Sequence, residues 1–291
     1  MLVQTKPKVA VLLAAYNGMQ WIDEQVASIL NQSDVEVTIF ISVDLSADKT
    51  YEWGKQQEAS SKRFIVLPYG KRYGGAAKNF FRLIHDVDFS GFDYVSLADQ
   101  DDIWMPNKLH HAISLIQSQN YDAVSSDVIA FWEGGREKLV KKSYPQKKYD
   151  YLFEAAGPGC TYVFKTDALK DFKSFLSKNE AYVNKVALHD WMIYAYFRHN
   201  GFKWLIDDQP LMKYRQHSNN QVGFNSGLQA YKKRIKLVKQ KWYGTEVEKI
   251  SQLLENKERL TLFFRLKNFW QLRRRPRDAF ALLIMNLLGV Y

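Results

Sequence analysis

The 291-residue sequence has one cysteine, Cys160, and no apolar stretch near the roughly 20 residues that a membrane-spanning helix requires. A single thiol excludes an internal disulfide and is typical of a reducing compartment. The sequence also lacks a Walker loop and a dinucleotide-binding fingerprint, which disfavours a kinase or a dehydrogenase. No cleavage-type site of small residues precedes the first apolar run, residues 9–15, so we expect this run to be a strand.

Positive charge gathers at one end of the chain. Residues 231–291 carry 15 lysines and arginines against 5 acidic residues, whereas residues 1–230 carry 26 of each. A neutral body with a basic end suggests that the end meets an acidic surface while the body does something else. The neutral body also argues against a broad phosphate footprint, so we expect no nucleic-acid partner.

The C-terminal region, residues 228–291, is predicted to be helical and amphipathic. In residues 228–242 the apolar side chains fall on one helical face and lysines occupy the rest. Two further apolar segments flank a run of four arginines, Arg273, Arg274, Arg275 and Arg277. Basic amphipathic helices with aromatic residues suit the surface of an anionic membrane. A helical cap on the main domain, or a dimer contact, is the open alternative.

The first 120 residues alternate short apolar runs with helical periodicity. Such strand and helix units with short connections predict an α/β fold with a mostly parallel central sheet flanked by helices. The expected strands are residues 8–14, 35–43, 64–67 and 94–98, and the expected helices are residues 21–32, segments starting near residues 51 and 80, and residues 108–117.

Beyond residue 120 the alternation loosens. A lysine-rich segment, residues 133–150, has the composition of a mobile loop. The other expected elements are strands at residues 123–132, 160–164, 203–206 and 211–215, and a helix at residues 182–199. Asp190 lies in the middle of that helix beside Trp191. A carboxylate on an otherwise apolar helix needs a partner or a function.

Three carboxylates, Asp99, Asp101 and Asp102, directly follow the predicted strand at residues 94–98. Like charges in a partly buried site resist simultaneous ionisation unless a cation lies among them. Mg2+ and Mn2+ take oxygen ligands and leave positions for substrate phosphates, so the cluster predicts a substrate that carries a nucleotide. The alternative is a solvated turn in which Asp102 caps the following helix.

Two more loops follow predicted strands at the edge where α/β sheets bind ligands. Asp44 ends the second strand, where a carboxylate can accept hydrogen bonds from a base or a ribose. The alternative for this turn is a helix cap from Ser46 or Asp48. Residues 70–79 form a glycine-rich basic loop before a helix, which is a weak signal for an anion site.

Five segments together resemble a known family. They are VAVLLAAYNG, the Asp-x-Ser-x-Asp turn at Asp44 to Asp48, DQDDIWMPNKL, LHDWM and YRQHSNNQVG. Over residues 8–224 the chain resembles the inverting family 2 glycosyltransferases of the GT-A fold, and more narrowly their bacterial rhamnosyltransferase-like branch. The resemblance implies transfer of a sugar, rhamnose in this branch, from dTDP-rhamnose or a UDP-sugar to an acceptor hydroxyl with inversion. It further implies cell-surface polysaccharide synthesis, with a glycan or lipid-linked glycan as acceptor.

The resemblance implies a role for each donor-side residue. The base is expected to pack on the turn after the first strand, and a basic residue is expected near the diphosphate. Val43 stands where many family members have a further aspartate, which leaves the identity of the base open. The donor-side residues are Ala14, Tyr16 and Asn17 against the base, Asp44 reading it, Lys78 with Arg72 in reserve at the diphosphate, and Asp99 and Gln100.

The resemblance also assigns metal and catalytic residues. Asp101 is the expected direct ligand of Mn2+ or Mg2+, and Asp99 is the expected ribose contact or outer partner of the ion. His217 is either a further metal ligand or a packed structural residue. Asp190 matches the general base, and burial is expected to raise its pKa toward neutrality. Trp191, Gly159 and Cys160 are expected on the acceptor side, with core packing as the alternative.

We therefore expect a catalytic domain at residues 1–227, divided near residue 120 into a nucleotide-sugar half and an acceptor half, and the helical C-terminal region at residues 228–291. The enzyme would be cytoplasmic and peripherally bound to the inner face of the plasma membrane. The alternative function is a nucleotide-binding or nucleotidyl-transfer protein with a metal-dependent acidic site. That alternative leaves Asp190 and the basic C-terminal region unexplained.

Overall fold

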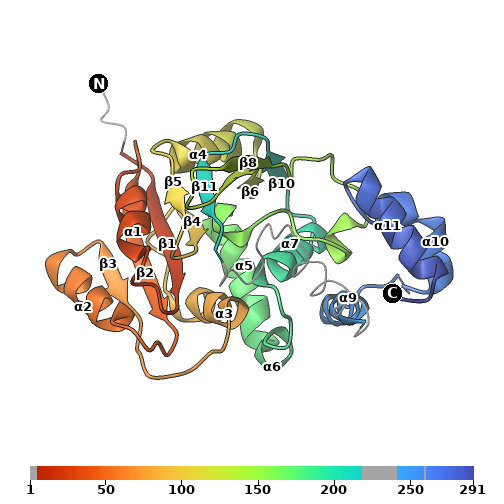
Figure 1. The fold of residues 1–291 in the computed structure, drawn as a ribbon, viewed down its shortest axis with the longest axis horizontal. Helices are drawn as coiled ribbons and strands as arrows, with labels where there is room; N and C mark the ends of the chain where they lie inside the picture. The colour runs from red at the N-terminus through yellow and green to blue at the C-terminus, as the bar shows by residue number, and fades with distance from the viewer. Residues whose placement is uncertain (1–4, 218–240, 259) are drawn as a thin grey trace.

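The structure, a computed structural model, describes residues 5–217, 241–258 and 260–291 (Figure 1). At its centre lies a seven-stranded sheet in the order β10-β6-β9-β4-β1-β2-β3. Strand β9 runs antiparallel to both of its neighbours, and the other pairs in this sheet are parallel. The strands are β1 (Lys8–Ala15), β2 (Glu36–Val43), β3 (Phe64–Val66), β4 (Tyr94–Ala98), β6 (Ala123–Ser126), β9 (Val163–Lys165) and β10 (Trp204–Asp207).

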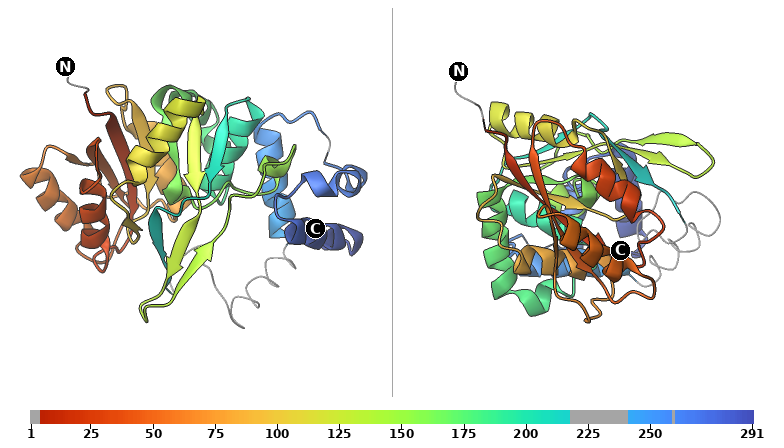
Figure 2. Two further views of the ribbon diagram at one scale, coloured as in Figure 1. Left: turned by 90° about the horizontal axis from the view of Figure 1, so that it is seen from above. Right: turned by 90° about the vertical axis from the view of Figure 1, so that its left-hand side faces the viewer.

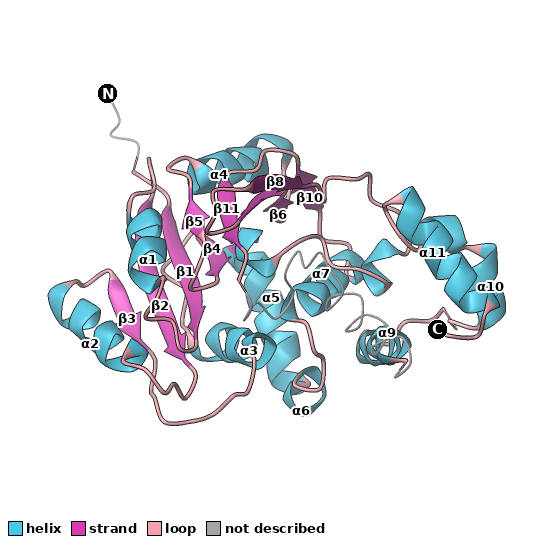
Figure 3. Cartoon of the chain, viewed as in Figure 1, coloured by secondary structure: helices cyan, strands magenta, loops and turns pink. Residues whose placement is uncertain are grey.

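Helices cover both faces of this sheet (Figure 3). The side chains of β1 alternate between two hydrophobic clusters, with Val11 and Leu13 in one and Ala10 and Leu12 in the other. Because both faces are covered, the strand is a continuous apolar run, as expected for a parallel sheet. One face carries α1 (Ile22–Leu30), α2 (Thr50–Ser60) and α4 (Lys108–Gln119), and the other carries α3 (Ala76–Asp86), α5 (Thr166–Lys178), α6 (Glu180–Val183) and α7 (His189–His199). The predicted α/β fold is confirmed.

A second, four-stranded sheet has the order β5-β11-β7-β8. Its strands are β5 (Ile103–Trp104), β11 (Met212–Arg215), β7 (Val128–Phe131) and β8 (Glu137–Val140). The single strand predicted at residues 123–132 is therefore wrong, because β6 and β7 belong to different sheets. Asp127, which is 1% exposed, separates them. The predicted loop at residues 133–150 is also wrong in part, since it contains β8, which pairs with β7 in a hairpin (Figure 2).

The helix predicted at residues 182–199 is two helices, α6 and α7. Residues 184–188 break it, and Asp190 lies in the first turn of α7 instead of the middle of a helix. Anions are favoured in this first turn because the backbone N–H groups there are unsatisfied. Helix α5 was not predicted.

The C-terminal helices are α9 (Trp242–Leu253), α10 (Leu262–Lys267) and α11 (Pro276–Leu287). They pack at the end of the molecule opposite to α2, next to α7 (Figures 1 and 2). Val247 and Ile250 of α9, Leu272 and Leu282 join the same hydrophobic cluster as α7. Glu246 also accepts the Ala187 N–H at 2.9 Å, immediately before α7. This part of the chain is therefore a helical appendage fixed to the sheet domain, as predicted.

The arginine run of the C-terminal region differs from expectation. Arg274 of the arginine run is buried in ion pairs with Asp150 and Glu154, and the partly exposed Arg273 lies near Glu154 and Asp278, so neither forms part of an open basic surface. The amphipathic helix predicted at residues 228–242 lies almost entirely outside the described residues. Among the helices that the structure describes, none has the length and apolar character to cross a bilayer.

Candidate active site

Three turns meet at the carboxyl ends of β4, β1 and β2, which are neighbours in the sheet. The Gln100 side chain holds the backbone of Tyr16, because its Oε1 accepts the Tyr16 N–H at 2.7 Å and its Nε2 donates to the Tyr16 carbonyl at 2.8 Å. Asn17 joins this turn to the next one, since its Oδ1 accepts the Ala47 N–H at 2.8 Å. At Gly18 a Cβ would lie 2.5 Å from Gln100 Oε1. These contacts fix the backbone of the turn that carries the half-exposed Tyr16 ring.

Asp44 is buried and anchors the glycine-rich loop that precedes α3. Its carboxylate accepts the N–H groups of Tyr73 at 2.7 Å and Gly74 at 2.8 Å, and that of Leu45 at 2.8 Å. Gly74 has a φ of 80°, a conformation that favours glycine. The structure thus gives Asp44 a structural contact that the sequence did not predict, and base recognition by Asp44 stays a prediction.

The carboxylates after β4 lie close together, as the sequence predicted. Asp99, Asp102 and Cys160 each place one potential ligand atom within 4.8 Å of the others. Burial and the charge of Asp101 raise the pKa of Asp99 to about 7, and the same causes raise the pKa of Asp102 well above its ordinary value. Asp102 does not cap a helix, since α4 begins at Lys108 and Asp102 Oδ1 accepts the Arg215 N–H at 3.1 Å.

Asp101 meets His217 across a long stretch of sequence. Asp101 Oδ2 lies 2.7 Å from His217 Nε2, although the residues are 116 positions apart. Arg215 Nε donates to the Asp101 carbonyl at 2.7 Å, and the His217 ring packs against Trp21 with centroids 4.2 Å apart. The structure therefore brings together Asp101 and His217, two of the predicted metal residues, although they are far apart in the sequence.

The acidic cluster, which we define as Asp99, Asp101 and Asp102, fits a hard divalent cation. Asp102 Oδ2 is buried and has no hydrogen-bond partner within the described residues. Together with the raised pKa values, this oxygen indicates that ionising the cluster is costly unless a cation lies among the carboxylates. Carboxylates suit Mg2+, and carboxylates with imidazole suit Mn2+. Burial raises the pKa of the Cys160 thiol well above its ordinary value, so Cys160 is a neutral neighbour and a poor ligand for such ions.

Asp190 has the properties of a general base. Burial raises its pKa to about 6, while its Oδ1 accepts the Trp191 N–H at 2.7 Å. The Tyr162 hydroxyl is within hydrogen-bond distance of the Asp190 carbonyl, at 3.3 Å, and of the Gly157 carbonyl, at 3.1 Å. A carboxyl group with this pKa is ionised at neutral pH and still basic enough to accept a proton. The charge of Asp190 contributes to the raised pKa of Asp99, which places the two groups within electrostatic reach.

A model of the family described as glycosyl transferase family 2 matches residues 10–175. The chain belongs to this family. The relative dTDP-rhamnosyl transferase RfbG of Shigella flexneri is 43% identical over 289 residues, which cover 96% of this chain and 100% of that protein. A second relative, UDP-Glc:alpha-D-GlcNAc-diphosphoundecaprenol beta-1,3-glucosyltransferase WfgD of Escherichia coli, is 26% identical over 184 residues, or 60% of this chain and 67% of that protein.

Solved structures confirm the GT-A fold of this family 2 glycosyltransferase. S. aureus TarS in complex with UDP has a TM-score of 0.57 and 14% identity, covering 97% of this chain and 90% of that chain. Mannosyltransferase PcManGT from Pyrobaculum calidifontis has a TM-score of 0.54 and 15% identity, covering 98% and 76%. The predicted family and glycosyltransferase activity are confirmed by the family match and the relatives, and the nucleotidyl-transfer alternative is not favoured.

Lys142 lies within electrostatic reach of Asp190, and no sequence pattern indicates this placement. Asp127 fixes its position by accepting the Lys142 N–H at 2.5 Å and the Ser143 N–H at 2.8 Å. The Lys142 side chain lies along Gly157, where a Cβ would be 3.4 Å from Lys142 Cγ. Burial lowers the pKa of Lys142, whereas the charges of Glu154 and Asp190 raise it. In turn the ammonium group lowers the pKa of Asp190.

The residues predicted on the acceptor side are packed into the fold. Trp191 is 3% exposed, donates its Nε1–H to the Tyr151 carbonyl at 3.0 Å and stacks on Tyr243 of α9. Cys160 is fully buried beside the acidic cluster. Gly159 faces the ring of His189, where a Cβ would lie 2.3 Å from Nε2. These contacts agree with the core-packing alternative, and the acceptor-side role of Trp191, Gly159 and Cys160 stays a prediction.

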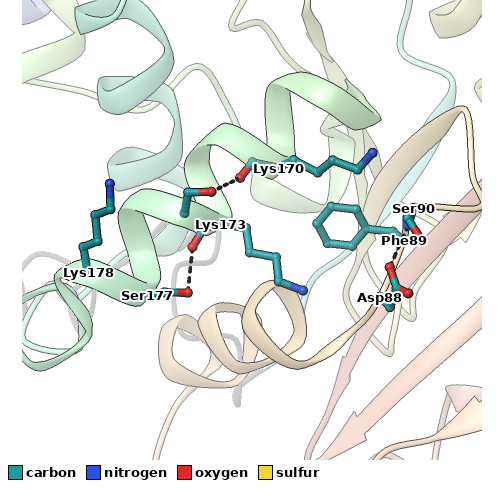
Figure 4. A pocket seen from close by; sticks show the side chains of 8 residues that line it. Asp88, Phe89, Ser90, Lys170, Lys173, Ser177 and Lys178 are labelled. Atoms are coloured by element: carbon teal, nitrogen blue, oxygen red, sulfur yellow. Dashed lines mark hydrogen bonds between the residues drawn. The ribbon is translucent and has the colours of Figure 1, made fainter.

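Lys78 is exposed in the first turn of α3, the helix that follows the glycine-rich loop. An anion is favoured at this helix end, so the position agrees with the predicted contact to a diphosphate. A surface pocket of about 630 Å3 lies elsewhere, lined by residues near Asp88 and by Lys170, Lys173 and Lys178 of α5 (Figure 4). None of the predicted site residues lines it, so this pocket is not the donor site.

Proposed function

We propose that the chain transfers rhamnose from dTDP-rhamnose to an acceptor hydroxyl with inversion, in the synthesis of a cell-surface polysaccharide. The observation that carries this proposal is a general base candidate, Asp190, within electrostatic reach of the acidic cluster. A relative that is 43% identical over nearly the whole chain is named a dTDP-rhamnosyl transferase, which supports the donor. A UDP-sugar is the second candidate donor.

The donor would bind along the carboxyl ends of β4, β1 and β2. Its base would lie against Ala14, Tyr16 and Asn17, on the turn that Gln100 holds in place. Asp44 would contact the base through the lone pairs that its three backbone partners leave. Lys78 would approach the diphosphate at the N-terminal end of α3, where the backbone N–H groups favour an anion.

A divalent ion, Mn2+ or Mg2+, would be held by Asp101 and Asp99 with His217. Its contribution when bound would be to neutralise charge on the diphosphate leaving group. Two hydrogen bonds hold the turn that carries these ligands. Asp102 accepts the Arg215 N–H, and the Arg215 side chain donates to the Asp101 carbonyl. Asp102 thereby positions the turn that carries Asp101.

Asp190 would accept the proton of the acceptor hydroxyl. As that oxygen forms its bond to the anomeric carbon, the bond from this carbon to the diphosphate breaks, and its electron pair leaves with the diphosphate. A single displacement of this kind inverts the anomeric centre. Lys142 supports the role of Asp190, since a neighbouring positive charge keeps a buried carboxyl group ionised near neutral pH.

The acceptor would be a glycan or a lipid-linked glycan. One relative carries a diphosphoundecaprenol-linked acceptor in its name, which agrees with a lipid-linked substrate here. We therefore place the enzyme in the cytoplasm, peripherally bound to the inner face of the plasma membrane through its C-terminal region. The net positive charge of that region supports this location.

The test is the variant Asp190→Asn. It preserves shape but removes the base, so turnover of dTDP-rhamnose should fall about 100-fold or more, in line with general-base contributions. Binding of dTDP-rhamnose, measured by calorimetry with Mn2+ present, should be retained. Asp167→Asn is the matched control, because Asp167 is an exposed aspartate that pairs only with Lys170 within the described residues. Normal turnover in Asp190→Asn would remove Asp190 from the mechanism.

A further inference from the structure

The C-terminal helices expose an unusual amount of apolar surface. The described residues include 13 exposed large apolar side chains, and eight of them lie between residues 262 and 290. This segment is only a tenth of the chain by length, so the exposure is concentrated and not scattered. The eight are Leu262, Phe263, Trp270, Phe280, Ile284, Leu287, Leu288 and Val290. Contiguous exposed apolar surface of this kind marks an interaction site.

Helix α11 is apolar on two opposite faces. Ala279 and Leu282 are buried against the rest of the molecule, whereas Ile284, Leu287 and Leu288 are 55%, 66% and 69% exposed. With Phe280 these exposed residues follow the i, i+4, i+7, i+8 spacing of one helical face. The Trp270 ring extends this face, because its centroid lies 5.6 Å from that of Phe280. We call Trp270, Phe280, Ile284, Leu287 and Leu288 the apolar face.

Cations from two distant segments border the apolar face. Lys147 Nζ lies 5.8 Å from the centroid of the Trp270 ring. The segment that carries Lys147 is fixed there, since the N–H groups of Lys148 and Tyr149 donate to the Gln271 side chain at 3.3 Å and the Gln271 carbonyl at 3.1 Å. Lys267 and Arg277 are exposed on the same helices. The one acidic residue of α11, Asp278, already pairs with Arg273 and Arg277.

We propose that the apolar face docks on an anionic phospholipid bilayer, with α11 lying in the plane of the interface and the bordering cations at the headgroups. An apolar helical face with an aromatic residue and surrounding lysines has the composition of an interfacial helix. A two-fold dimer through the same surface would bring identical cations together, which disfavours a second copy of the chain. Arg274 takes no part, because it is buried against Asp150, and Arg273 is already near the acidic groups of Glu154 and Asp278.

This inference rests on the proposed membrane location and deepens it by naming the surface that contacts the bilayer, but it does not depend on the chemistry. Vesicle binding is measured without donor or acceptor, so a failure of the rhamnosyl assignment would leave it unaffected. The experiment is co-flotation of the full-length protein with vesicles of phosphatidylcholine alone and of phosphatidylcholine with phosphatidylglycerol. We expect binding to the anionic vesicles at low salt and little binding to the neutral ones.

The triple variant Ile284→Gln, Leu287→Gln, Leu288→Gln should weaken binding about tenfold or more, because apolar burial drives interfacial insertion. The pair Leu139→Gln, Tyr182→Gln is the matched control, since both side chains are exposed outside the apolar face. Replacing Lys147, Lys148 and Lys267 by Gln should remove the salt-sensitive part of binding. The same change at Lys6, Lys62 and Lys178, which are exposed elsewhere, should leave the salt-sensitive part of binding unchanged.

Thermal unfolding of each variant serves as the check that the fold is retained. We expect it to be retained, because the substituted side chains are exposed. Three results would overturn the proposal. One is no binding of the full-length protein to anionic vesicles at low salt. Another is full binding by the Ile284, Leu287 and Leu288 variant. The last is sedimentation showing a dimer that this variant dissociates, without vesicle binding by the original protein, because the apolar face would then be a subunit contact.

Discussion

Two groups of acidic side chains in this fold have opposite surroundings. Asp150 is fully buried and is contacted by Arg198 at 3.2 Å, Arg274 at 3.1 Å and the Tyr194 hydroxyl at 3.0 Å. Glu154 lies near both Arg273 and Arg274. In the acidic cluster after β4, by contrast, neither Asp99 nor Asp102 forms an ion pair with any residue that the structure describes.

The difference separates structure from function. Buried carboxylates that are fully paired hold elements together, here the segment at residues 150–154 and the turn between α10 and α11. Where buried carboxyl groups have no ion-pair partner, burial and the charge of a neighbouring carboxylate raise their pKa values. This is the case for Asp99 and Asp102. This repulsion lies at the carboxyl ends of the strands, which is the edge where α/β sheets bind ligands. The first group therefore docks the C-terminal region, and the second is suited to receive a cation.

The largest expected effect is loss of stability when the paired group is broken. Arg274→Met should lower the free energy of unfolding by about 3–5 kcal/mol, because it removes the buried arginine that pairs with both Asp150 and Glu154 and leaves Asp150 with Arg198 as its one arginine partner among the described residues. Asp102→Asn should leave the free energy of unfolding unchanged or raise it, since it removes repulsion and keeps the hydrogen bond from Arg215. Urea unfolding with a chelator present measures both.

Arg275→Met provides the control for this pair of variants, because the partly exposed Arg275 guanidinium borders the Tyr144 ring, 6.0 Å from its centroid, and forms no ion pair with any described residue. It should change the free energy of unfolding by no more than about 0.5 kcal/mol, as is usual for surface positions. A loss of stability in Asp102→Asn equal to that in Arg274→Met would show that the two acidic groups are alike, and the comparison would fail.

The next effect is stabilisation by the cation itself. An ion that binds the folded state at 100 times its dissociation constant raises the free energy of unfolding by about 2.7 kcal/mol. Mn2+ should therefore raise the melting temperature of the original protein, and Asp101→Asn should reduce that rise. Asp171→Asn, which alters a carboxylate hydrogen-bonded to Tyr196, should keep the full rise in melting temperature. An equal rise in the original protein and in Asp101→Asn would place the ion elsewhere.

The same comparison explains what the sequence could and could not predict. The strands β1 to β4 and the acidic cluster follow from local patterns, because an apolar run of strand length ending in aspartates is visible in a short window. The family resemblance added His217 and Asp190. Gln100 was placed at the right turn, but its double contact with Tyr16 required the coordinates.

The acceptor half and the C-terminal region depend on contacts between distant residues, and these contacts could not be predicted from the sequence. Nothing near Asp127 shows that it fixes Lys142, and nothing near Asp150 shows that Arg274, 124 positions away, neutralises it. The arginine run looked like a surface feature because exposed and buried arginines are identical in sequence. The break between α6 and α7 was hidden by apolar residues that continue the helical period.

The third prediction concerns Lys142, whose ammonium group interacts electrostatically with Glu154 of the paired group and with Asp190. Asp190 must be ionised to act as a base, so kcat/KM should rise with pH and level off above its pKa of about 6. Lys142→Met should move this limb to higher pH, because loss of the ammonium group raises the pKa of Asp190. Lys142→Arg should restore the original profile.

The pH profile of kcat/KM with donor and acceptor at fixed Mn2+ measures this shift. Lys141→Met, one residue earlier and exposed, is the control and should leave the profile unchanged. If Lys142→Met lowers activity at every pH but kcat/KM still levels off at the original pH, then Lys142 only packs against Gly157 and does not set the pKa of Asp190.

The smallest expected effect comes from Tyr162→Phe, which tests whether Asp190 belongs to the rigid part of the fold. The Tyr162 ring is fully buried, and its hydroxyl lies within hydrogen-bond distance of the Gly157 and Asp190 carbonyls. Removing that hydroxyl should lower the free energy of unfolding by about 1 kcal/mol, the net value of a typical hydrogen bond. Because the carboxyl group of Asp190 keeps its contact with the Trp191 N–H, the pH limb of kcat/KM should stay at about 6. A moved limb in Tyr162→Phe would mean that the first turn of α7 is held by this hydroxyl and not by the packing of α9 and Trp191.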